Sequence, residues 1–307
     1  MSDPQGAARP DLPLLSRLYA QGDFAGLEAE ARRQLERFPG EGFLWKVLGV
    51  ALDSQGKDAV AALTRAVELL PGDAECRSNL GNACKAAGNL AAAEACYREA
   101  LRMQPEFTTA HYNLGVLLQA QERWPEAAAS YAQALALAPE FAVAHFNLGL
   151  VRESLDDPAG AEAAYLAAIR CDPRYVDAHY NLGLLCQNRG DLARAEAIYR
   201  GALLLSPAHA EMHCNLGEVS RRLGRPDFAA ACFAEALRLK PDLAEAHCGL
   251  ANLRTGEWRF AEAEPAFREA LRLQPGYPEA LVGLAVALQG QGRYAEAELA
   301  CREALSL

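Results

Sequence analysis

The sequence predicts an all-α solenoid of antiparallel helix pairs, because three residue patterns recur with one period. A Leu-Gly or Leu-Ala pair returns every 34 residues, at 80–81, 114–115, 148–149, 182–183, 216–217, 250–251 and 284–285. Proline keeps the same period from Pro105 to Pro275, and alanine keeps it from Ala93 to Ala297. A constant period of this length is typical of a solenoid in which each repeat is one supersecondary unit.

The composition agrees with helices. Hydrophobic residues make up 51% of the 307 residues but aromatic residues only 7%, because alanine and leucine, both strong helix formers, fill the difference. The net charge of −10 argues against a nucleic-acid partner, whose phosphates would require clustered lysine and arginine.

Three features bear on localisation. The N-terminal stretch MSDPQGAARPDLPLL lacks a basic start followed by an apolar segment, so we expect no signal peptide. No apolar run approaches ~18 residues, so we expect no membrane partner. The nine cysteines are odd in number and form no CxxC pair. We interpret them as reduced, mostly buried small side chains, which indicates a cytoplasmic protein.

The period also predicts the domain organisation. Residues 1–11 are rich in glycine, proline and alanine, and we expect them to be disordered. Residues 12–39 resemble a degenerate helix pair that caps the array, and residues 42–307 form the array itself. Its units are expected to start near residues 42, 74, 108, 142, 176, 210, 244 and 278.

Each unit should contain two helices. In the unit that starts at residue 108, the pattern predicts helices over 108–121 and 124–138. Gly115 is small enough to let these helices approach closely, and Tyr131 fills the space beside it. Pro139 should end the second helix, because it lacks an N–H group and disfavours helix at the preceding residue.

These columns resemble the tetratricopeptide repeat, whose pattern has Trp, Leu-Gly, Ala, an aromatic residue and Pro at fixed offsets. The best single match to its opening is the stretch 45–49, WKVLG, and the resemblance covers about residues 42–307. It implies a right-handed α-solenoid superhelix whose first helices line a concave groove. Such a groove holds a protein or peptide partner.

An asparagine stands directly before each Leu-Gly pair of the main array: Asn79, Asn113, Asn147, Asn181 and Asn215. By the resemblance, this position lines the groove. An amide offers one acceptor and two donors, so a row of amides can bind the backbone of an extended peptide. Similar ladders serve this purpose in the repeat arms of O-linked N-acetylglucosamine transferases. The alternative is that the column reflects shared ancestry alone.

Apolar residues flank the amides, and the resemblance places them in the same groove: Tyr112, Phe146, Tyr180, Val116, Leu150 and Leu184. Aromatic side chains beside amides suit a peptide with apolar anchors. The alternative is that some of these rings pack between adjacent helices.

A histidine column comprises His111, His145, His179, His213 and His247. Neighbouring helices pack about 8–10 Å apart, whereas Zn–N bonds are about 2.0–2.1 Å long. Equivalent histidines of adjacent repeats will therefore rarely reach one ion. They occupy the position of the family's tryptophan, which packs within a helix pair, so we expect packing and no metal or other cofactor.

Two absences narrow the function. Some three-repeat members clamp acidic chaperone tails with Lys and Arg on the groove face, but those cations are missing here. The chain also has no GxSxG motif, no P-loop and no GxGxxG after a strand. We therefore predict a scaffold that is not an enzyme and that binds an extended peptide or partner segment in the groove.

One alternative is a substrate-recruiting arm of a larger transferase, similar to O-linked N-acetylglucosamine transferases or to repeat-bearing sulfotransferases, whose catalytic domain is absent here. The stretch AHYNLGVLLQAQERWPEAAASYAQALALAP carries that likeness. The last unit ends at Leu307 without a polar capping helix, although terminal repeats normally need one. We therefore expect either a longer parent protein or self-association through the uncapped C-terminal helix.

Overall fold

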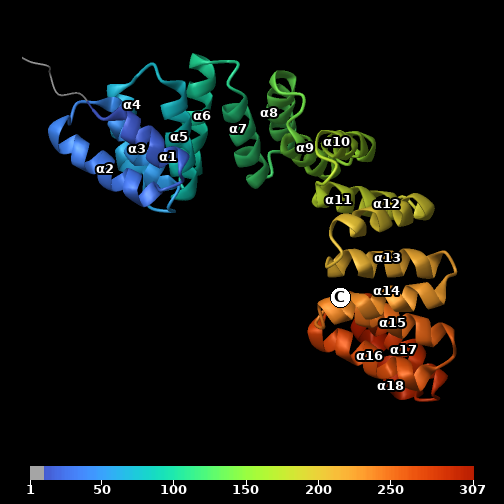
Figure 1. Ribbon diagram of the computed structural model, residues 1–307. Coiled ribbons are helices and arrows are strands. Elements are labelled where there is room, and N and C mark those ends of the chain that lie inside the picture. The colour runs from blue at the N-terminus through green and yellow to red at the C-terminus, as the bar shows by residue number, and fades with distance from the viewer. Residues whose placement is uncertain (1–9) are drawn as a thin grey trace, which may run out of the picture. The chain divides into compact units, whose positions relative to one another are not determined.

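The computed structural model describes residues 10–307, and all regular secondary structure in this range is helical (Figure 1). This confirms the all-α prediction. The predicted disordered segment 1–11 lies outside the described residues, apart from Pro10 and Asp11. In chain order the helices are α1 (Leu12–Ala20), α2 (Phe24–Arg37), α3 (Gly42–Asp53), α4 (Val60–Leu69), α5 (Ala74–Ala86), α6 (Leu90–Met103), α7 (Thr108–Ala120), α8 (Trp124–Leu137), α9 (Ala142–Ser154), α10 (Pro158–Cys171), α11 (Val176–Asn188), α12 (Leu192–Leu205), α13 (Ala210–Arg222), α14 (Pro226–Leu239), α15 (Ala244–Gly256), α16 (Phe260–Leu273), α17 (Pro278–Gly290) and α18 (Tyr294–Leu305).

The chain divides into two compact units, residues 1–161 and 162–307. Within each unit the helices pack as consecutive pairs, and the first helix of a pair also contacts the first helix of the next pair. These contacts join α3, α5, α7 and α9 in the first unit and α11, α13, α15 and α17 in the second. We call the surface formed by these helices the first-helix face of each unit.

The helix ends follow from local chemistry. The side chain of Asp73 accepts a hydrogen bond from the N–H of Cys76 at the start of α5, and Asn89 caps α6 in the same way. At the other end of a pair, α8 stops at Leu137, and Ala138 takes φ −134° and ψ 83° before Pro139. This extended conformation is the one that a following proline favours, and it confirms the predicted end of the helix.

The core of each pair is an aromatic ring packed against a glycine. A Cβ atom on Gly115 would lie 2.7 Å from the ring of Tyr131, which is closer than real Cβ contacts, so only glycine allows this packing. The ring position is fully buried in six successive pairs, at Tyr97, Tyr131, Tyr165, Tyr199, Phe233 and Phe267. The predicted roles of Gly115 and Tyr131 are thereby confirmed.

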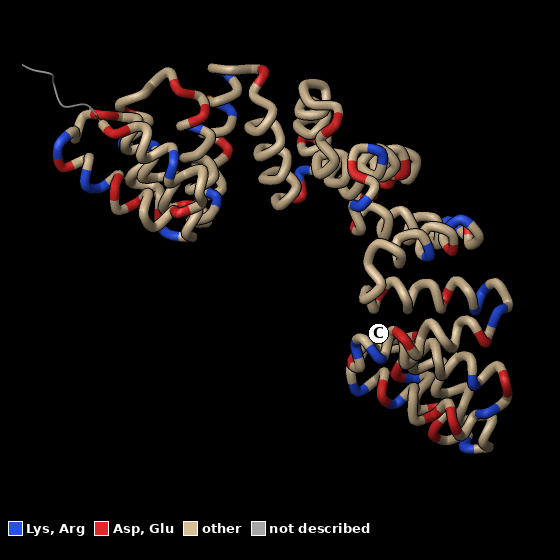
Figure 2. The backbone as a smooth tube through the Cα atoms, viewed as in Figure 1, with Lys and Arg blue, Asp and Glu red and all other residues tan. Residues whose placement is uncertain are grey.

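Ion pairs join successive helix pairs on the side of the second helices. Glu94 of α6 accepts from Arg123, which lies just before α8, at 2.8 Å, and Glu264 of α16 accepts from Arg293, just before α18, at 2.7 Å. The glutamate side chains are only 14% exposed in both pairs. Elsewhere in each unit, acidic and basic residues are interspersed along the helices (Figure 2).

Candidate functional site

The predicted asparagine column lies on the first helices of both units. Each asparagine precedes a residue that packs toward the core, and one helical step turns the amide by about 100° toward the edge of the buried face. All five amides are accordingly half-buried. The first unit carries Asn79, Asn113 and Asn147, and the second unit carries Asn181 and Asn215.

Hydrogen bonds occupy the donor side of three of these amides. Nδ2 of Asn113 donates to Oδ1 of Asn82 at 3.1 Å, and the same oxygen accepts from the hydroxyl of Tyr97 at 2.7 Å. Asn82 belongs to α5 and Asn113 to α7. The amide column therefore contributes to the contact between successive first helices, a role that the repeat pattern did not predict.

One amide in each unit also donates to the hydroxyl of a tyrosine on the preceding first helix. Nδ2 of Asn147 donates to the hydroxyl of Tyr112 at 3.2 Å, and Nδ2 of Asn215 donates to the hydroxyl of Tyr180 at 3.2 Å. Within the described part of the chain, no group donates to Oδ1 of Asn113, Asn147 or Asn215. Each of these three amides therefore keeps a carbonyl oxygen that can accept a further hydrogen bond.

The aromatic column packs between successive helix pairs. The ring of Tyr112 lies 5.9 Å from that of Tyr131 and 4.9 Å from that of Phe141, measured between centroids. The ring of Tyr180 lies 6.4 Å from that of Tyr199 in the same manner, and burial raises the pKa of Tyr180. The rings are half-buried, so they serve packing and still border the surface.

The remaining predicted site residues share that intermediate exposure: Phe146, Val116, Leu150 and Leu184. Val116 packs against the core of the first unit beside Tyr112. Half-buried apolar residues thus lie on the same first helices as the amides, on α7, α9 and α11.

The histidine column has a structural role. Nε2 of each histidine lies within hydrogen-bond distance of the carbonyl oxygen of the proline six residues earlier, at 2.8 Å for His111 and Pro105 and at 2.9 Å for His213 and Pro207. Trp45 donates to the carbonyl of Pro39 at 2.9 Å in the equivalent place. The imidazole therefore replaces the indole that the repeat pattern has at this position.

One pocket on the first-helix face was not predicted. It has a volume of about 300 Å³ and lies in the second unit, where Asn215 and Glu218 of α13 and Glu245 and Asn252 of α15 border it. A signal was present in the sequence, because Glu218 follows Val116, Leu150 and Leu184 in its column and Gly249 replaces the next asparagine of the ladder.

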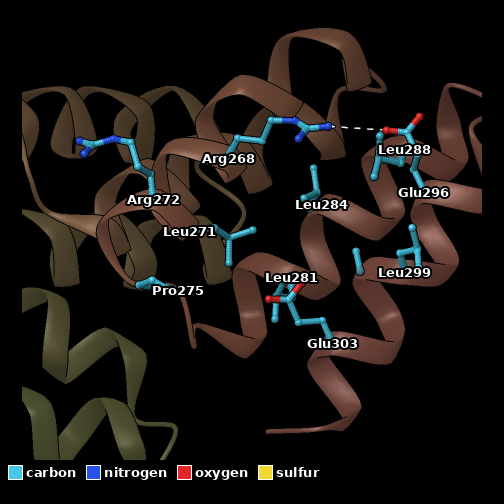
Figure 3. A pocket seen from close by; sticks show the side chains of 11 residues that line it. Arg268, Leu271, Arg272, Pro275, Leu281, Leu284, Leu288, Glu296, Leu299 and Glu303 are labelled. Carbon is cyan, nitrogen blue, oxygen red and sulfur yellow. Dashed lines mark ion pairs between the residues drawn. The ribbon is translucent and has the colours of Figure 1, made fainter.

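A second cavity lies at the last helix pair. It has a volume of about 440 Å³ between α16, α17 and α18, with Leu284, Leu288 and Leu299 on its walls and Arg268 and Glu296, 3.8 Å apart, beside it (Figure 3). Leu299 is 64% exposed. This cavity shares no residue with the amide column.

Two kinds of feature are absent from the described residues. Over residues 10–307, no group of three or more His, Cys, Asp or Glu side chains has the proximity needed to hold a metal ion. Among the helices of the same range, none combines the length and the apolar character needed to cross a membrane.

Comparisons with known proteins agree with this geometry. Models described as tetratricopeptide repeat match residues 78–140, 116–176, 164–197, 210–243 and 256–306. A comparison with curated proteins finds no match.

Solved structures show the same architecture. The chain is similar to YrrB, whose structure is described as a TPR protein with an unusual peptide-binding site, with 25% identity, a TM-score of 0.55, and coverage of 61% of this chain and 96% of that chain. It is also similar in fold to PilF of Pseudomonas aeruginosa, with 22% identity, a TM-score of 0.58 and coverage of 71% and 96%. For MamA the identity is 23%, the TM-score 0.52, and the coverage 55% and 92%.

Proposed function

Because the chain belongs to the tetratricopeptide-repeat family, we propose that it is a non-catalytic scaffold that binds an extended peptide or partner segment on its first-helix face. The observation that carries this proposal is the set of half-buried amides at one position of successive repeats. An extended strand presents backbone N–H groups at regular intervals, and a row of side-chain acceptors is complementary to them.

The hydrogen bonds within the fold support a role for the amide oxygens, and not the amide N–H groups, in peptide binding. Asn147 and Asn215 use Nδ2 to bind Tyr112 and Tyr180. Their Oδ1 atoms are left to accept from peptide N–H groups. The ladder would therefore act as a row of acceptors, and the internal bond holds each amide in one orientation before a ligand arrives, which lowers the entropic cost of binding.

The apolar column would supply the remaining affinity. Val116 and Leu150 in the first unit and Leu184 in the second lie one helical turn from the amides and are half-buried, so peptide side chains that cover them would remove apolar surface from water. This arrangement supports a partner with apolar anchors spaced along an extended segment. The peptide-binding site described for YrrB makes the same kind of ligand a reasonable first choice.

The test is a substitution of the amides with a matched control. Peptide ligands would first be selected from a library of random extended peptides, and their affinity measured by fluorescence anisotropy. Replacing Asn113, Asn147 and Asn181 together by Ala should weaken binding by about tenfold or more, since each lost hydrogen bond is worth about 0.5–1.5 kcal/mol. The control is Asn188→Ala, because Asn188 is exposed at the end of α11.

A second variant tests whether the amide oxygen of Asn147, acting as an acceptor, accounts for its contribution to affinity. In Asn147→Asp the acceptor oxygen is kept, and the hydroxyl of Tyr112 can donate to the carboxylate. We expect Asn147→Asp to retain more affinity than Asn147→Ala. Unchanged affinity in the folded triple variant, or equal losses in the triple variant and in Asn188→Ala, would remove the amide ladder from the proposal.

We also propose that the protein is cytoplasmic. Six of the nine cysteines are buried as free thiols, and the cytoplasm keeps thiols reduced. We also propose that copies of the chain associate through α18, because Leu299 is 64% exposed beside a cavity that Leu284 and Leu288 also line. Light scattering after size-exclusion chromatography should then show a dimer that Leu299→Glu converts to a monomer, and a monomeric wild type at high concentration would contradict this.

A further inference from the structure

The unpredicted pocket on the second unit arises where the repeat pattern changes at several positions at once. Gly249 stands where five earlier repeats have an asparagine, and Phe233 stands where four earlier repeats have a tyrosine. A Cβ atom on Gly249 would overlap the ring of Phe233. The ring thus lies directly against the backbone of α15, which helps to bury it to 1% exposure, and position 249 contributes no side chain to the pocket.

The charges in this pocket are predominantly negative. Glu218, Glu245, Glu279 and Arg221 are its charged residues, which gives a formal charge of −2 from three acidic groups and one basic group. Arg221 binds Glu218 at 2.7 Å. Glu245 and Glu279 are exposed and have no ion pair within the described residues, so two uncompensated carboxylates border the pocket.

The inner wall of the pocket is uncharged but lies within reach of the field of the carboxylates. Cys214 is only 5% exposed and lines the pocket. Burial raises the pKa of its thiol to about 12, with further contributions from Glu245 and Glu218. Each carboxylate raises the free energy of a second negative charge at this point and would lower that of a positive charge.

Several polar groups that line the pocket can accept hydrogen bonds, whereas Arg221 is a donor that already binds Glu218. Nδ2 of Asn215 is used by Tyr180, and Nδ2 of Asn252 lies 3.7 Å from Sγ of Cys248. Their Oδ1 atoms, together with the carboxylates of Glu245 and Glu279, need donors. Lysine and arginine side chains have three and five N–H donors and no acceptor, so a basic side chain matches this wall in both charge and hydrogen bonding.

We propose that this pocket receives the side chain of an arginine or lysine from an extended peptide bound to the first-helix face of the second unit. The inference rests on the proposed function and names its ligand chemistry. The aliphatic stem of the basic residue would lie against the half-buried ring of Tyr277, which lines the pocket, as long charged side chains commonly pack on apolar surface. Its head group would bind Glu245 and Glu279 through charge-assisted hydrogen bonds.

The probes are three fluorescein-labelled peptides of about nine residues in which alanine alternates with arginine, glutamine or glutamate, a length that matches an extended segment over two to three repeats. Anisotropy at physiological salt should show that the arginine peptide binds wild-type protein about tenfold or more tightly than the glutamine peptide. The glutamate peptide should bind most weakly. Higher salt should selectively weaken the binding of the arginine peptide, because salt screens the attraction between exposed charges.

Matched variants assign the effect to this pocket. The double variant Glu245→Gln, Glu279→Gln should weaken the arginine peptide by about fivefold or more and leave the glutamine peptide unchanged. The control double variant, Glu106→Gln and Glu140→Gln, makes the same change in net charge at exposed positions of the first unit, and it should bind like wild type. All four glutamates are exposed, and circular dichroism would check that helicity is retained.

The outcomes are separable. Equal affinity of the arginine and glutamine peptides for wild type, or equal losses in the two double variants, overturns the basic-side-chain pocket while peptide binding itself stands. Failure of all three peptides to bind the wild-type protein counts against both the pocket and the proposed function. If the Glu245→Gln, Glu279→Gln variant selectively loses affinity for the arginine peptide, the result supports both the pocket and the proposed function.

Discussion

Nδ2 of Asn147 donates a hydrogen bond to the hydroxyl of Tyr112, 3.2 Å away and 35 residues earlier in the chain. The bond joins α9 to α7 and so couples the first helices of two successive pairs. Asn215 and Tyr180 repeat it between α13 and α11. Three amides of the asparagine column therefore connect neighbouring repeats through their nitrogen atoms.

The coupling predicts a measurable contribution to stability. Tyr112→Phe removes the acceptor while keeping the ring, and the repeat that contains Phe146 shows that phenylalanine fits this position. We expect the free energy of unfolding to fall by about 1 kcal/mol, as for other partly buried hydrogen bonds. Urea denaturation followed by circular dichroism measures it. Tyr19→Phe is the control, because Tyr19 is 58% exposed, and an equal loss in both variants would contradict the prediction.

Two glycine-to-alanine substitutions should have opposite effects. Gly115→Ala places a Cβ atom 2.7 Å from the ring of Tyr131, and we expect a destabilisation of about 1–3 kcal/mol from overpacking. Gly201 lies on the exposed side of α12, and a Cβ atom added there would meet no heavy atom within 4 Å. Gly201→Ala should stabilise by up to about 1 kcal/mol through helix propensity. Thermal unfolding of both variants checks the signs.

The turn between α15 and α16 is strained. Trp258 has φ +61° and is 80% exposed, whereas six equivalent turns carry glycine with positive φ. The left-handed conformation costs a non-glycine residue about 1–2 kcal/mol, and an edge-to-face contact with Phe260 at 5.8 Å offsets only part of this. Trp258→Gly should raise the melting temperature. Trp258→Ala removes the ring but keeps the strain, so an equal gain in both variants would refute this explanation.

The stability of the first unit should depend on Glu28 at acid pH. Hydrogen bonds from Lys57 and then Arg32 lower the pKa of Glu28 to about 2. Because the folded pKa is below the unfolded value of about 4.3, the contribution is complete above that value and is lost as the pH falls toward 2. Glu28→Gln should reduce the slope of stability against pH in this window. Glu36→Gln, at an exposed position of α2, should keep the wild-type slope.

Much of the fold could be predicted from the period. Small residues at Gly115 and its equivalents, a ring at Tyr131 and a proline after each second helix predict where helices stop and which faces meet, because these are short-range packing rules within about 34 residues. The asparagine column and its apolar flank were also visible as surface positions. The resemblance to the tetratricopeptide repeat predicted that both columns border the groove.

The hydrogen bonds between repeats and the negatively charged pocket could not be predicted, because they depend on side chains from different repeats. The hydrogen bond from Asn147 to Tyr112 joins residues on separate helix pairs, and so does the contact of Gly249 with the ring of Phe233. The repeat pattern specifies each of these residues singly. It does not specify the distance between them, which is set by how closely consecutive pairs pack.

By itself, the sequence determined the helix pairs, their order and the columns of residues on each face, because a regular repeat places equivalent side chains in equivalent local environments. Only the tertiary structure decided which half of each amide is already bonded and where the repeats leave a negatively charged pocket. Those outcomes rest on hydrogen bonds and contacts of about 3–4 Å between separate helices, and a one-dimensional pattern does not carry distances of that kind.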